Sequence, residues 1–503
     1  MRSNTTRRMF IQGAATLTSA AASGGIGDFL FGSQKVKLAV VGVMGKGYSD
    51  WLPMYKTGKV EIVGLCDCDT TVRAKLQKRL MKDGIPLDLT SVPFYSDYRR
   101  LLDDCDKLKV ECMTISTPNH THAPIAVQAM KKGIHCFVQL PLVRTLWELD
   151  YFRRTADEYG VVTQLGNQGS SLDSFRRNVE ILQSGILGDV SEVHIWTNRP
   201  VWPQGFPCAE VVKGGADPIP DGLNWNAWLG PAKERPFKGQ YPEGWNGYNP
   251  WKLCQNVYHQ FAWRGFRDFG CGGLEMACHM MNLPFRGLEL DGVTNVECSY
   301  AEELNEIAFP TKSSIQWTFA ARKSKVRSGA YLPAVRMFWY DGGQMPYTDL
   351  APEVFLRFGN IPKTGCLIVG SKGMVLVLDD YGAKCSLALT GEASSQDIFA
   401  HPATKVVARA IPFIQRTSSS GFADGHYVEF INAVMGEGNY YKDIESRCYS
   451  DVKFSDPFME AILTGVVAVQ TQTSMTWDHT SKRFDSKEAN SLLRPYIRSG
   501  YEF

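Results

Sequence analysis

The sequence predicts an α/β protein in which a doubly wound, parallel sheet precedes a second α/β domain with a largely antiparallel sheet. From residue 36 to about residue 163, short β-branched apolar runs alternate with longer amphipathic runs, the pattern of strand–helix units around a buried parallel sheet. From residue 164 onward, stretches rich in Trp, Pro and Gly separate strands whose polar and apolar residues alternate. We therefore place one domain at 36–163 and a second at 164–503, whose C-terminal segment can pack back on the first.

The elements of the first domain follow one another as alternating strands and helices. The expected strands are residues 36–41, 61–66, 110–115, 135–138 and 161–165. The expected helices are residues 48–56, 70–82, 122–132 and 145–159. Thr145 and Glu148 have the spacing of a capping box at the start of the last helix. In the second domain the clearest strands are residues 190–196, 314–319 and 335–339.

Charge and hydropathy exclude two classes of protein. The 503 residues hold 54 Lys and Arg against 52 Asp and Glu, a formal charge of +2, so the chain has no overall field for nucleic acid or an anionic membrane. No apolar run has the length of a membrane-spanning helix. The 13 cysteines form no CxxC pair, which argues against a disulfide framework and a structural zinc site. We expect buried thiols, no nucleic-acid partner and no membrane span.

Residues 1–35 have the pattern of an export signal rather than of a folded element. Arg7 and Arg8 precede a mildly apolar segment at 11–15, and small residues follow at 19–23. The arginine pair resembles the twin-arginine signal, whose pathway exports folded proteins, and predicts a periplasmic location. Folded export would also reconcile unpaired cysteines with an oxidising compartment. The alternative is a tail in which the two arginines adjoin by chance.

A glycine-rich loop directly after the first strand indicates dinucleotide binding. Gly42-Val43-Met44-Gly45-Lys46-Gly47 leads into a helix, and such a loop lets a pyrophosphate approach the backbone and the positive end of the helix. Asp67 follows at the end of the second strand, where a carboxylate can accept hydrogen bonds from a ribose 2′-hydroxyl. This carboxylate favours NAD over NADP, whose 2′-phosphate it would repel.

Alternatives to this interpretation stay open. Asp69 is a rival for the ribose contact, and Met44 replaces the second glycine of the fingerprint. A turn in a nucleotide-free α/β domain is the alternative for the whole loop. Thr117, Pro118 and Asn119 follow the strand at 110–115, at the edge where such sheets bind ligands. They are further candidate cofactor contacts, or else part of an ordinary strand-to-helix turn.

A second glycine-rich run, at residues 270–273, precedes a helix that we expect to continue to Leu283 and to end at Pro284. On such a helix Glu275 and His279, four residues apart, lie on one face. A carboxylate beside an imidazole can orient it and raise its basicity, which suits a general base that accepts a hydroxyl proton. Both are candidate catalytic residues. The alternative is a pair without a catalytic role.

The sequence indicates neither a metal site nor a serine hydrolase. The pairs His120–His122 and Cys278–His279 lack further ligands at recognisable spacing, so we predict no catalytic metal. No GxSxG motif is present.

Tryptophan is concentrated in one part of the second domain. Seven of the 12 tryptophans fall between Trp196 and Trp263, and aromatic rings commonly stack on the apolar faces of sugars. The candidate substrate contacts are Arg199, Trp202, Gln204, Trp263 and Arg264. The alternative is that these rings pack in a core or a subunit interface.

Taken together, several segments resemble the Gfo/Idh/MocA oxidoreductases. Besides the glycine loop and Asp67, the segments that carry the likeness are Thr117-Pro118-Asn119-His120-Thr121-His122, Val138-Gln139-Leu140-Pro141-Leu142, Gly166-Asn167-Gln168-Gly169, Trp225-Asn226-Ala227-Trp228-Leu229-Gly230-Pro231 and Ala277-Cys278-His279. The resemblance implies a Rossmann domain, an open-faced α/β domain, NAD(P)-dependent chemistry on sugars or cyclitols, and a homo-oligomer formed through the open sheet. The exported, twin-arginine branch of the family is the most similar.

The resemblance also implies roles for single residues. The family's catalytic lysine, in an E/Q-K-P motif, corresponds to Leu140, its aspartate to Glu275 and its histidine to His279. Only the histidine is unchanged, and Leu140 cannot donate a proton or polarise a carbonyl. The matching positions add candidates for the cofactor, His122, Gln139 and Pro141, and for the substrate, Asn167 and Gln168.

The expected function is that of an exported NAD-dependent oxidoreductase that transfers hydride to or from a carbohydrate or cyclitol. One alternative is a redox-assisted glycoside hydrolase or lyase that recycles a tightly bound NAD. The other is a sugar-binding homologue that has lost the chemistry, which the change at Leu140 favours.

Overall fold

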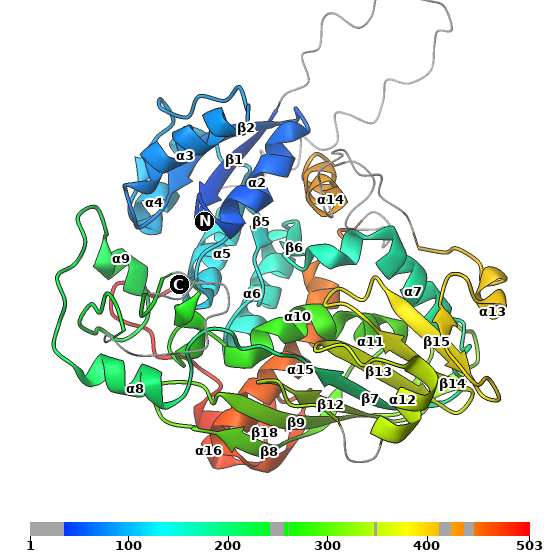
Figure 1. Ribbon diagram of the computed structural model, residues 1–503. Coiled ribbons are helices and arrows are strands. Elements are labelled where there is room, and N and C mark those ends of the chain that lie inside the picture. The colour runs from blue at the N-terminus through cyan, green and yellow to red at the C-terminus, as the bar shows by residue number, and fades with distance from the viewer. Residues whose placement is uncertain (1–34, 242–255, 260, 347–349, 412–423, 437–446) are drawn as a thin grey trace, which may run out of the picture. The chain divides into compact units, whose positions relative to one another are not determined.

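The computed structural model of the chain describes residues 35–241, 256–259, 261–346, 350–411, 424–436 and 447–503 (Figure 1). The predicted export signal, residues 1–35, lies outside the described residues except for Lys35. Residues Val36–Phe503 form one compact unit that contains two large sheets. None of the described helices combines the length and the apolar character needed to cross a membrane.

Six parallel strands form the first sheet, in the order β3-β2-β1-β4-β5-β6. They are β1 Val36–Val41, β2 Val60–Cys66, β3 Phe94–Tyr95, β4 Cys112–Ile115, β5 His135–Val138 and β6 Thr163–Leu165. The five strands expected from the sequence are present, and the short β3 is additional. The strand order reverses between β1 and β4, and ligands of such sheets bind at the carboxyl ends of the strands at this point.

Helices cover both faces of the first sheet. One face carries α2 Lys46–Lys56 and α3 Val72–Lys82, and the other carries α4 Tyr98–Leu108, α5 His122–Lys131 and α6 Leu146–Tyr159. Thr145 and Glu148 form the predicted capping box at α6. The sequence pattern predicts no element between residues 83 and 109, where the structure has β3 and α4.

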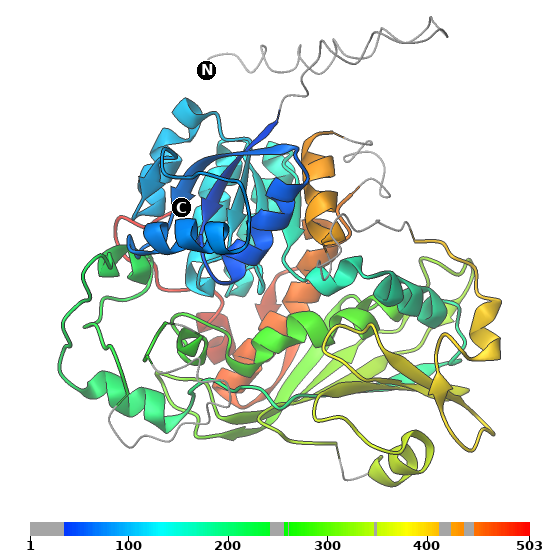
Figure 2. The same cartoon turned by 45° about the horizontal axis from the view of Figure 1, so that its top comes forward.

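A helix from much later in the chain completes the α2 face of this sheet. Helix α14, Gly425–Val434, contributes Tyr427, Phe430 and Ile431 to the apolar cluster that contains Val40 and Phe137 of the sheet. Figures 1 and 2 both show α14 beside α2. The first sheet therefore needs a segment of the second domain for its own core.

Ten strands form the second sheet, in the order β16-β15-β14-β13-β7-β12-β9-β8-β17-β18. They are β7 Val190–Trp196, β8 Val293–Glu302, β9 Lys312–Phe319, β12 Val335–Tyr340, β13 Gly365–Gly370, β14 Gly373–Val377, β15 Cys385–Leu389, β16 Gln396–Asp397, β17 Ser474–Asp478 and β18 Arg483–Phe484. Among the described strands of this sheet, β7 and β12 alone pair in parallel, so the sheet is largely antiparallel. The predicted fold class, a doubly wound Rossmann-type sheet followed by a mostly antiparallel one, is confirmed.

The remaining described elements include a small two-stranded sheet of β10 Arg322–Lys323 and β11 Tyr331–Leu332. The other helices are α7 Asp173–Gln183, α8 Phe206–Lys213, α9 Trp225–Leu229, α10 Ala277–Met280, α11 Asn282–Gly287, α12 Ala351–Phe358, α13 Pro402–Lys405, α15 Val452–Thr471 and α16 Lys487–Ser491.

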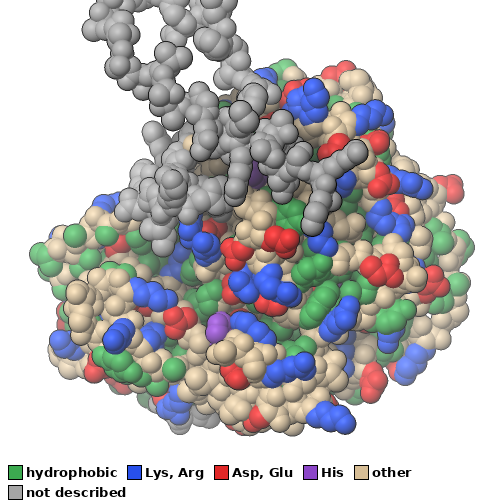
Figure 3. All heavy atoms as spheres, turned by 180° about the vertical axis from the view of Figure 1, so that it is seen from behind, with side chains coloured by type: hydrophobic (Ala, Val, Ile, Leu, Met, Phe, Trp, Pro, Cys, Tyr) green, Lys and Arg blue, Asp and Glu red, His purple; other side chains and the backbone are tan. Residues whose placement is uncertain are grey.

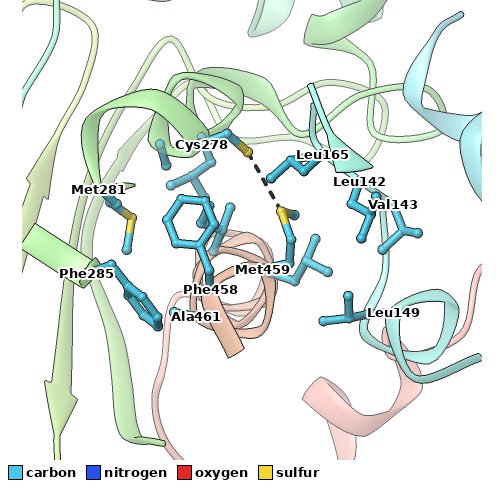
Figure 4. Packing of buried hydrophobic residues seen from close by; sticks show 14 of the residues in the cluster. Leu142, Val143, Leu149, Leu165, Cys278, Met281, Phe285, Phe458, Met459 and Ala461 are labelled. Carbon is cyan, nitrogen blue, oxygen red and sulfur yellow. Dashed lines mark hydrogen bonds between the residues drawn. The ribbon is translucent and has the colours of Figure 1, made fainter. Parts of the chain in front are cut away.

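A single apolar core joins the two sheets. Helix α15 places Phe458 and Met459 between Leu165 at the end of β6 and the α10–α11 segment (Figure 4). The thiol of Cys278 donates to the sulfur of Met459 at 3.8 Å, and both residues are buried. The carboxyl edge of the first sheet therefore shares this core with the inner face of the second.

The segment that carries the candidate catalytic residues differs from the expected helix. Residues Gly272–Met276 form a 3₁₀ helix, which is followed by the short helices α10 and α11. Pro284 lies in the first turn of α11 and does not end a helix; a proline is tolerated there because the first turn has no internal partner for its missing N–H.

The described residues show mixed surface charge and unpaired cysteines. Lys and Arg lie interspersed with Asp and Glu on the face in Figure 3. The described cysteines are free thiols, all buried except the half-buried Cys68.

Candidate active site

The glycine loop has the geometry of a phosphate-binding turn. Gly42 and Gly45 have φ of +81° and +59°, and a Cβ on Gly42 would lie 2.5 Å from the carbonyl oxygen of Ser116. A Cβ on Gly47 would lie 1.8 Å from the carbonyl oxygen of Gly42. By contrast, no heavy atom lies within 4 Å of the Cβ position of Gly45, and no side chain caps α2. The start of α2 is therefore open to an anion.

Met44, which replaces the second glycine of the fingerprint, is half-buried and packs against the apolar cluster that contains Val43 and Trp51. The larger side chain is thus accommodated by the core of the first sheet.

The geometry distinguishes the two rival carboxylates after β2. Asp69 accepts hydrogen bonds from the backbone N–H and the hydroxyl of Thr71, at 2.9 and 2.5 Å, and so serves the start of α3. Asp67 is half-buried and accepts from the backbone N–H groups of Val43 and Asp69, at 3.2 and 3.1 Å. Burial raises the pKa of Asp67 to about 6. Asp67 rather than Asp69 is tied to the glycine loop, as a ribose-binding carboxylate would be.

His122 links two of the loops at the carboxyl edge. Its ring nitrogens lie 2.8 Å from the carbonyl oxygens of Thr117 and Pro141. Burial lowers the pKa of His122 to about 4, so the ring is neutral at pH 7 and donates to one of the two carbonyls. Thr117 and Pro118 are half-buried. His122 therefore fixes the loops that present Thr117 and Pro118, a positioning role in this geometry.

Buried polar atoms without hydrogen-bond partners gather at the ends of three neighbouring strands. Within the described residues they are Oδ1 of Asn119 after β4, Nε2 of Gln139 after β5, and both amide atoms of Asn167 and Oε1 of Gln168 after β6. A buried polar atom without a partner is costly, so this edge is built for a polar ligand. Together with the open glycine loop and Asp67, Asn119 and Gln139 fit a bound dinucleotide, and Asn167 and Gln168 are left for a further polar ligand.

His279 lies beside this edge and is held in its neutral form. Its half-buried ring packs edge-on against Tyr381, with centroids 4.9 Å apart. Burial, and then the positive charges of Lys46 and Arg199, lower the pKa of His279 to about 3. Tyr381 in turn packs against Gly169, where a Cβ would lie 2.8 Å from its ring. The imidazole is thus a free base next to the segment that carries Gln168.

Glu275 does not orient His279, which corrects the expectation from the sequence. Its carboxylate accepts from the Asn119 amide at 2.8 Å and from the Cys271 N–H at 3.2 Å, and it pairs with Nε of Arg264 at 2.6 Å. Burial raises the pKa of Glu275, and Arg264 opposes this effect. The reason for the difference is that Glu275 lies in the 3₁₀ turn and that a buried carboxylate requires a cationic partner. Glu275 joins the β4 loop to the second domain.

The predicted substrate residues divide into two groups. Arg199 pairs with Asp380 at 2.8 Å and contributes charge at His279, so it lies near the candidate site together with Asn167 and Gln168. Trp202 and Trp263 are instead buried, and the guanidinium of Arg264 lies 5.7 and 4.3 Å from their ring centroids. These two rings enclose the arginine that pairs with Glu275. Gln204 is also buried, where it accepts from the Trp202 indole.

Several residues near the site carry little signal in the sequence. Asp380 and Tyr381 lie in the turn after β14, and Asp50 and Tyr427 lie on α2 and α14. Lys46 pairs with Asp50, a carboxylate that is fully buried. The polar turn at Asp379–Gly382 is the one local feature that marks any of them as unusual.

Comparisons with known proteins agree with this geometry. Residues 36–167 match the family model GFO_IDH_MocA, described as the oxidoreductase family with an NAD-binding Rossmann fold. Glycosyl hydrolase family 109 protein 2 of Akkermansia muciniphila is 30% identical over 167 residues, 31% of this chain and 32% of that protein. An alpha-N-acetylgalactosaminidase of Shewanella oneidensis is 30% identical over 113 residues, 22% of this chain and 24% of that protein. The chain thus spans about a third or less of these relatives.

Solved structures cover most of the chain at low identity. An inositol dehydrogenase homologue of Azotobacter vinelandii, complexed with NAD+, covers 88% of this chain and 98% of its own, with a TM-score of 0.56 and 14% identity. An oxidoreductase of Pseudomonas syringae covers 88% and 99%, with a TM-score of 0.53 and 14% identity. These similarities establish the fold. The expected cofactor type is confirmed by the family of the first domain, and residues 36–167 match the NAD-binding Rossmann domain of the Gfo/Idh/MocA oxidoreductases.

Proposed function

We propose that the protein is an NAD-dependent enzyme that removes hydride from a carbinol carbon of a carbohydrate, with His279 as the base for the hydroxyl proton. The observation that supports this most directly is the neutral, half-buried imidazole of His279 beside the unpartnered amides of Asn167 and Gln168. When bound, NAD supplies the hydride acceptor. An imidazole that is neutral at pH 7 has an unprotonated nitrogen that can accept a hydroxyl proton, and its low pKa means that this transfer relies on charges that develop when cofactor and substrate bind.

The electrostatics suit the developing charge on the substrate oxygen. Lys46 and Arg199 each oppose a positive charge on His279, and the same cations favour a negative charge on a hydroxyl that is losing its proton. They place positive charge at the site although Leu140, at the position of the usual lysine, cannot. Leu140 packs against the shared apolar core.

The amides of Asn167 and Gln168 provide the polar contacts that a sugar requires. Their unpartnered atoms are both donors and acceptors, which matches hydroxyl groups that donate and accept at once. A carbohydrate bound there would satisfy atoms that otherwise remain buried without partners.

A second candidate function is redox-assisted cleavage of a glycosidic bond. The names of the curated relatives, a glycosyl hydrolase and an alpha-N-acetylgalactosaminidase, favour it. In this reaction the sugar hydroxyl is first oxidised to a carbonyl, which acidifies the adjacent C–H. Loss of that proton expels the glycosidic oxygen, water adds to the double bond, and the hydride returns to the carbonyl. The sum is hydrolysis, with no net change in the cofactor.

One experiment separates these functions. The chain is purified without added nucleotide and denatured, and any released dinucleotide is identified by mass spectrometry. The native protein is then offered free sugars, cyclitols and aryl glycosides, including an aryl α-N-acetylgalactosaminide. Net accumulation of NADH indicates a dehydrogenase, and aglycone release without net NADH indicates cleavage. Sugar binding that NAD does not affect, with neither NADH nor aglycone formed, would contradict both and leave a binding protein.

Export to the periplasm is a separate proposal. Arg7 and Arg8 support twin-arginine export. Fractionation of cells that express the chain with Arg7→Lys and Arg8→Lys tests it: loss of the periplasmic pool is expected, and an unchanged distribution would contradict export by this route.

A further inference from the structure

Helix α14 is fastened to the first sheet at several points along its length. The side-chain amide of Gln164 on β6 donates to the carbonyl of His426 at 2.7 Å, and the His426 ring contacts the Leu165 carbonyl at 2.9 Å. At the other end of the helix, Lys59 donates to Asn432 at 2.9 Å. These contacts give α14 a fixed position relative to the strands that precede the candidate cofactor site.

From this helix Tyr427 reaches a buried carboxylate beneath the glycine loop. The Tyr427 hydroxyl donates to Oδ1 of Asp50 at 2.9 Å, and the Ser116 hydroxyl donates to Oδ2 at 2.7 Å. Nζ of Lys46 pairs with the same carboxylate and donates to the Tyr427 hydroxyl at 3.2 Å. Asp50 is fully buried, so these three partners stabilise a charge that would otherwise be very unfavourable.

Lys46 connects this network of hydrogen bonds to the candidate cofactor site. Lys46 is the first residue of α2, immediately after Gly45, whose surroundings are open. Its side chain remains 39% exposed although Asp50 and Tyr427 anchor its ammonium group. An ammonium has three donors, and within the described residues two are used. The third is available to an anion at the start of α2.

We propose that Tyr427 is a positioning residue for the cofactor diphosphate: through its contacts with Asp50 and Lys46, it holds the Lys46 ammonium at the mouth of the glycine loop. This inference rests on the NAD-dependent function proposed above. The hydroxyl contributes twice, because it accepts from Lys46 and donates to the carboxylate that attracts the same ammonium. A helix of the second domain thereby helps to set the affinity of the first domain for its dinucleotide.

The test is the affinity of Tyr427→Phe for NADH, measured by fluorescence titration of protein freed of nucleotide. The phenylalanine keeps the ring that packs on Phe137 at 5.4 Å, so the fold is retained. We expect affinity to fall about three- to tenfold, the effect of losing one or two polar contacts. The matched control is Tyr48→Phe, which removes a hydroxyl that donates to Asp83 at 2.8 Å on the exposed side of α2. Its affinity should equal that of the wild type.

A second measurement separates positioning from a general effect on packing. In a Lys46→Gln background, Tyr427→Phe should produce no further loss of NADH affinity, because the ammonium that it positions is gone. Equal losses in both backgrounds, or wild-type affinity in Tyr427→Phe, would overturn the inference while leaving the proposed function intact. Failure of the wild-type protein to bind NADH at all would overturn both.

Discussion

His279 is a base whose surroundings keep it unprotonated at neutral pH. Most histidines titrate near pH 6.5, whereas burial and two nearby cations lower the pKa of this one to about 3. Its readiness to accept a proton therefore does not vary over the physiological range. Any acid limb in the activity above about pH 4 belongs to another group.

Replacing His279 by Gln tests its role directly. The amide keeps a polar group of similar size but cannot accept the proton, so we expect kcat to fall by about 10²- to 10⁴-fold. The content of NAD after purification should match the wild type, because the candidate dinucleotide contacts lie on the first sheet and its loops. Turnover within a few fold of the wild type would remove His279 from the mechanism.

Asp67 predicts a pH dependence of cofactor affinity. Its pKa, raised to about 6 by burial, means that the carboxylate protonates as the pH falls through that value and loses acceptor capacity for the ribose. The dissociation constant of NAD should therefore rise below about pH 6, by at most about tenfold per pH unit. Titrations between about pH 5 and pH 8 measure it. Asp67→Asn should bind more weakly and without this pH dependence, and a sloping profile in that variant would assign the effect elsewhere.

At the scale of elements, the 3₁₀ turn at Gly272–Met276 places the carboxylate of Glu275 at the loop after β4. The pattern of residues 270–283 predicts one continuous helix, which would place Glu275 beside His279. The structure instead pairs Glu275 with Arg264 and Asn119, because the desolvated charge is satisfied only by partners from other elements. Spacing within a segment cannot reveal such partners.

The energetic consequence is measurable in Arg264→Met. This change leaves the Glu275 carboxylate buried without its cation, and we expect a loss of about 3 to 5 kcal/mol of unfolding free energy at pH 7. Because burial already raises the pKa of Glu275, the carboxyl of the variant protonates as the pH is lowered, and the loss should shrink. Calorimetry at two pH values tests both points.

The matched control for that change is Arg264→Met combined with Glu275→Gln. With neither charge present, most of the lost stability should return. A double variant as unstable as Arg264→Met alone would show that the packing of Arg264 between Trp202 and Trp263 matters more than its charge.

Elements that depend on neighbouring residues can be predicted from the sequence. Features that depend on contacts between distant residues cannot. Five strands of the first sheet, the capping box at Thr145 and the glycine loop are recognisable because apolar period, caps and turns are properties of neighbouring residues. The two-residue β3 is too short to show a period. Asp50 has the appearance of an ordinary polar helix residue, and its burial depends on Tyr427, which lies 377 positions away.

At the scale of the whole molecule, the outer face of the second sheet remains the expected site of self-association. On β12, Val335, Met337 and Trp339 point into the core, whereas Phe338 faces outward and stacks on His194 at 4.7 Å. Part of this outer face is covered by α12. The rest presents aromatic rings, which favour an interface.

Phe338→Asp tests the predicted homo-oligomer. A charge at a buried interface is strongly unfavourable, so light scattering should report a smaller particle for this variant than for the wild type. Arg336→Ala, on the same strand but exposed, is the milder comparison. Equal masses for Phe338→Asp and the wild type would exclude this face as the interface.

The place of α14 has a consequence for the biosynthesis of the protein. The dinucleotide-binding domain emerges from the ribosome first, yet the residues that cover Phe137 and the Tyr427 hydroxyl that contacts Lys46 come from a helix that begins at Gly425. In a chain that stops before α14, an apolar face of the first sheet is exposed, and Lys46 lacks its contact with the Tyr427 hydroxyl. On the proposed role of Tyr427, NAD therefore binds with full affinity only after the chain has been synthesised through α14.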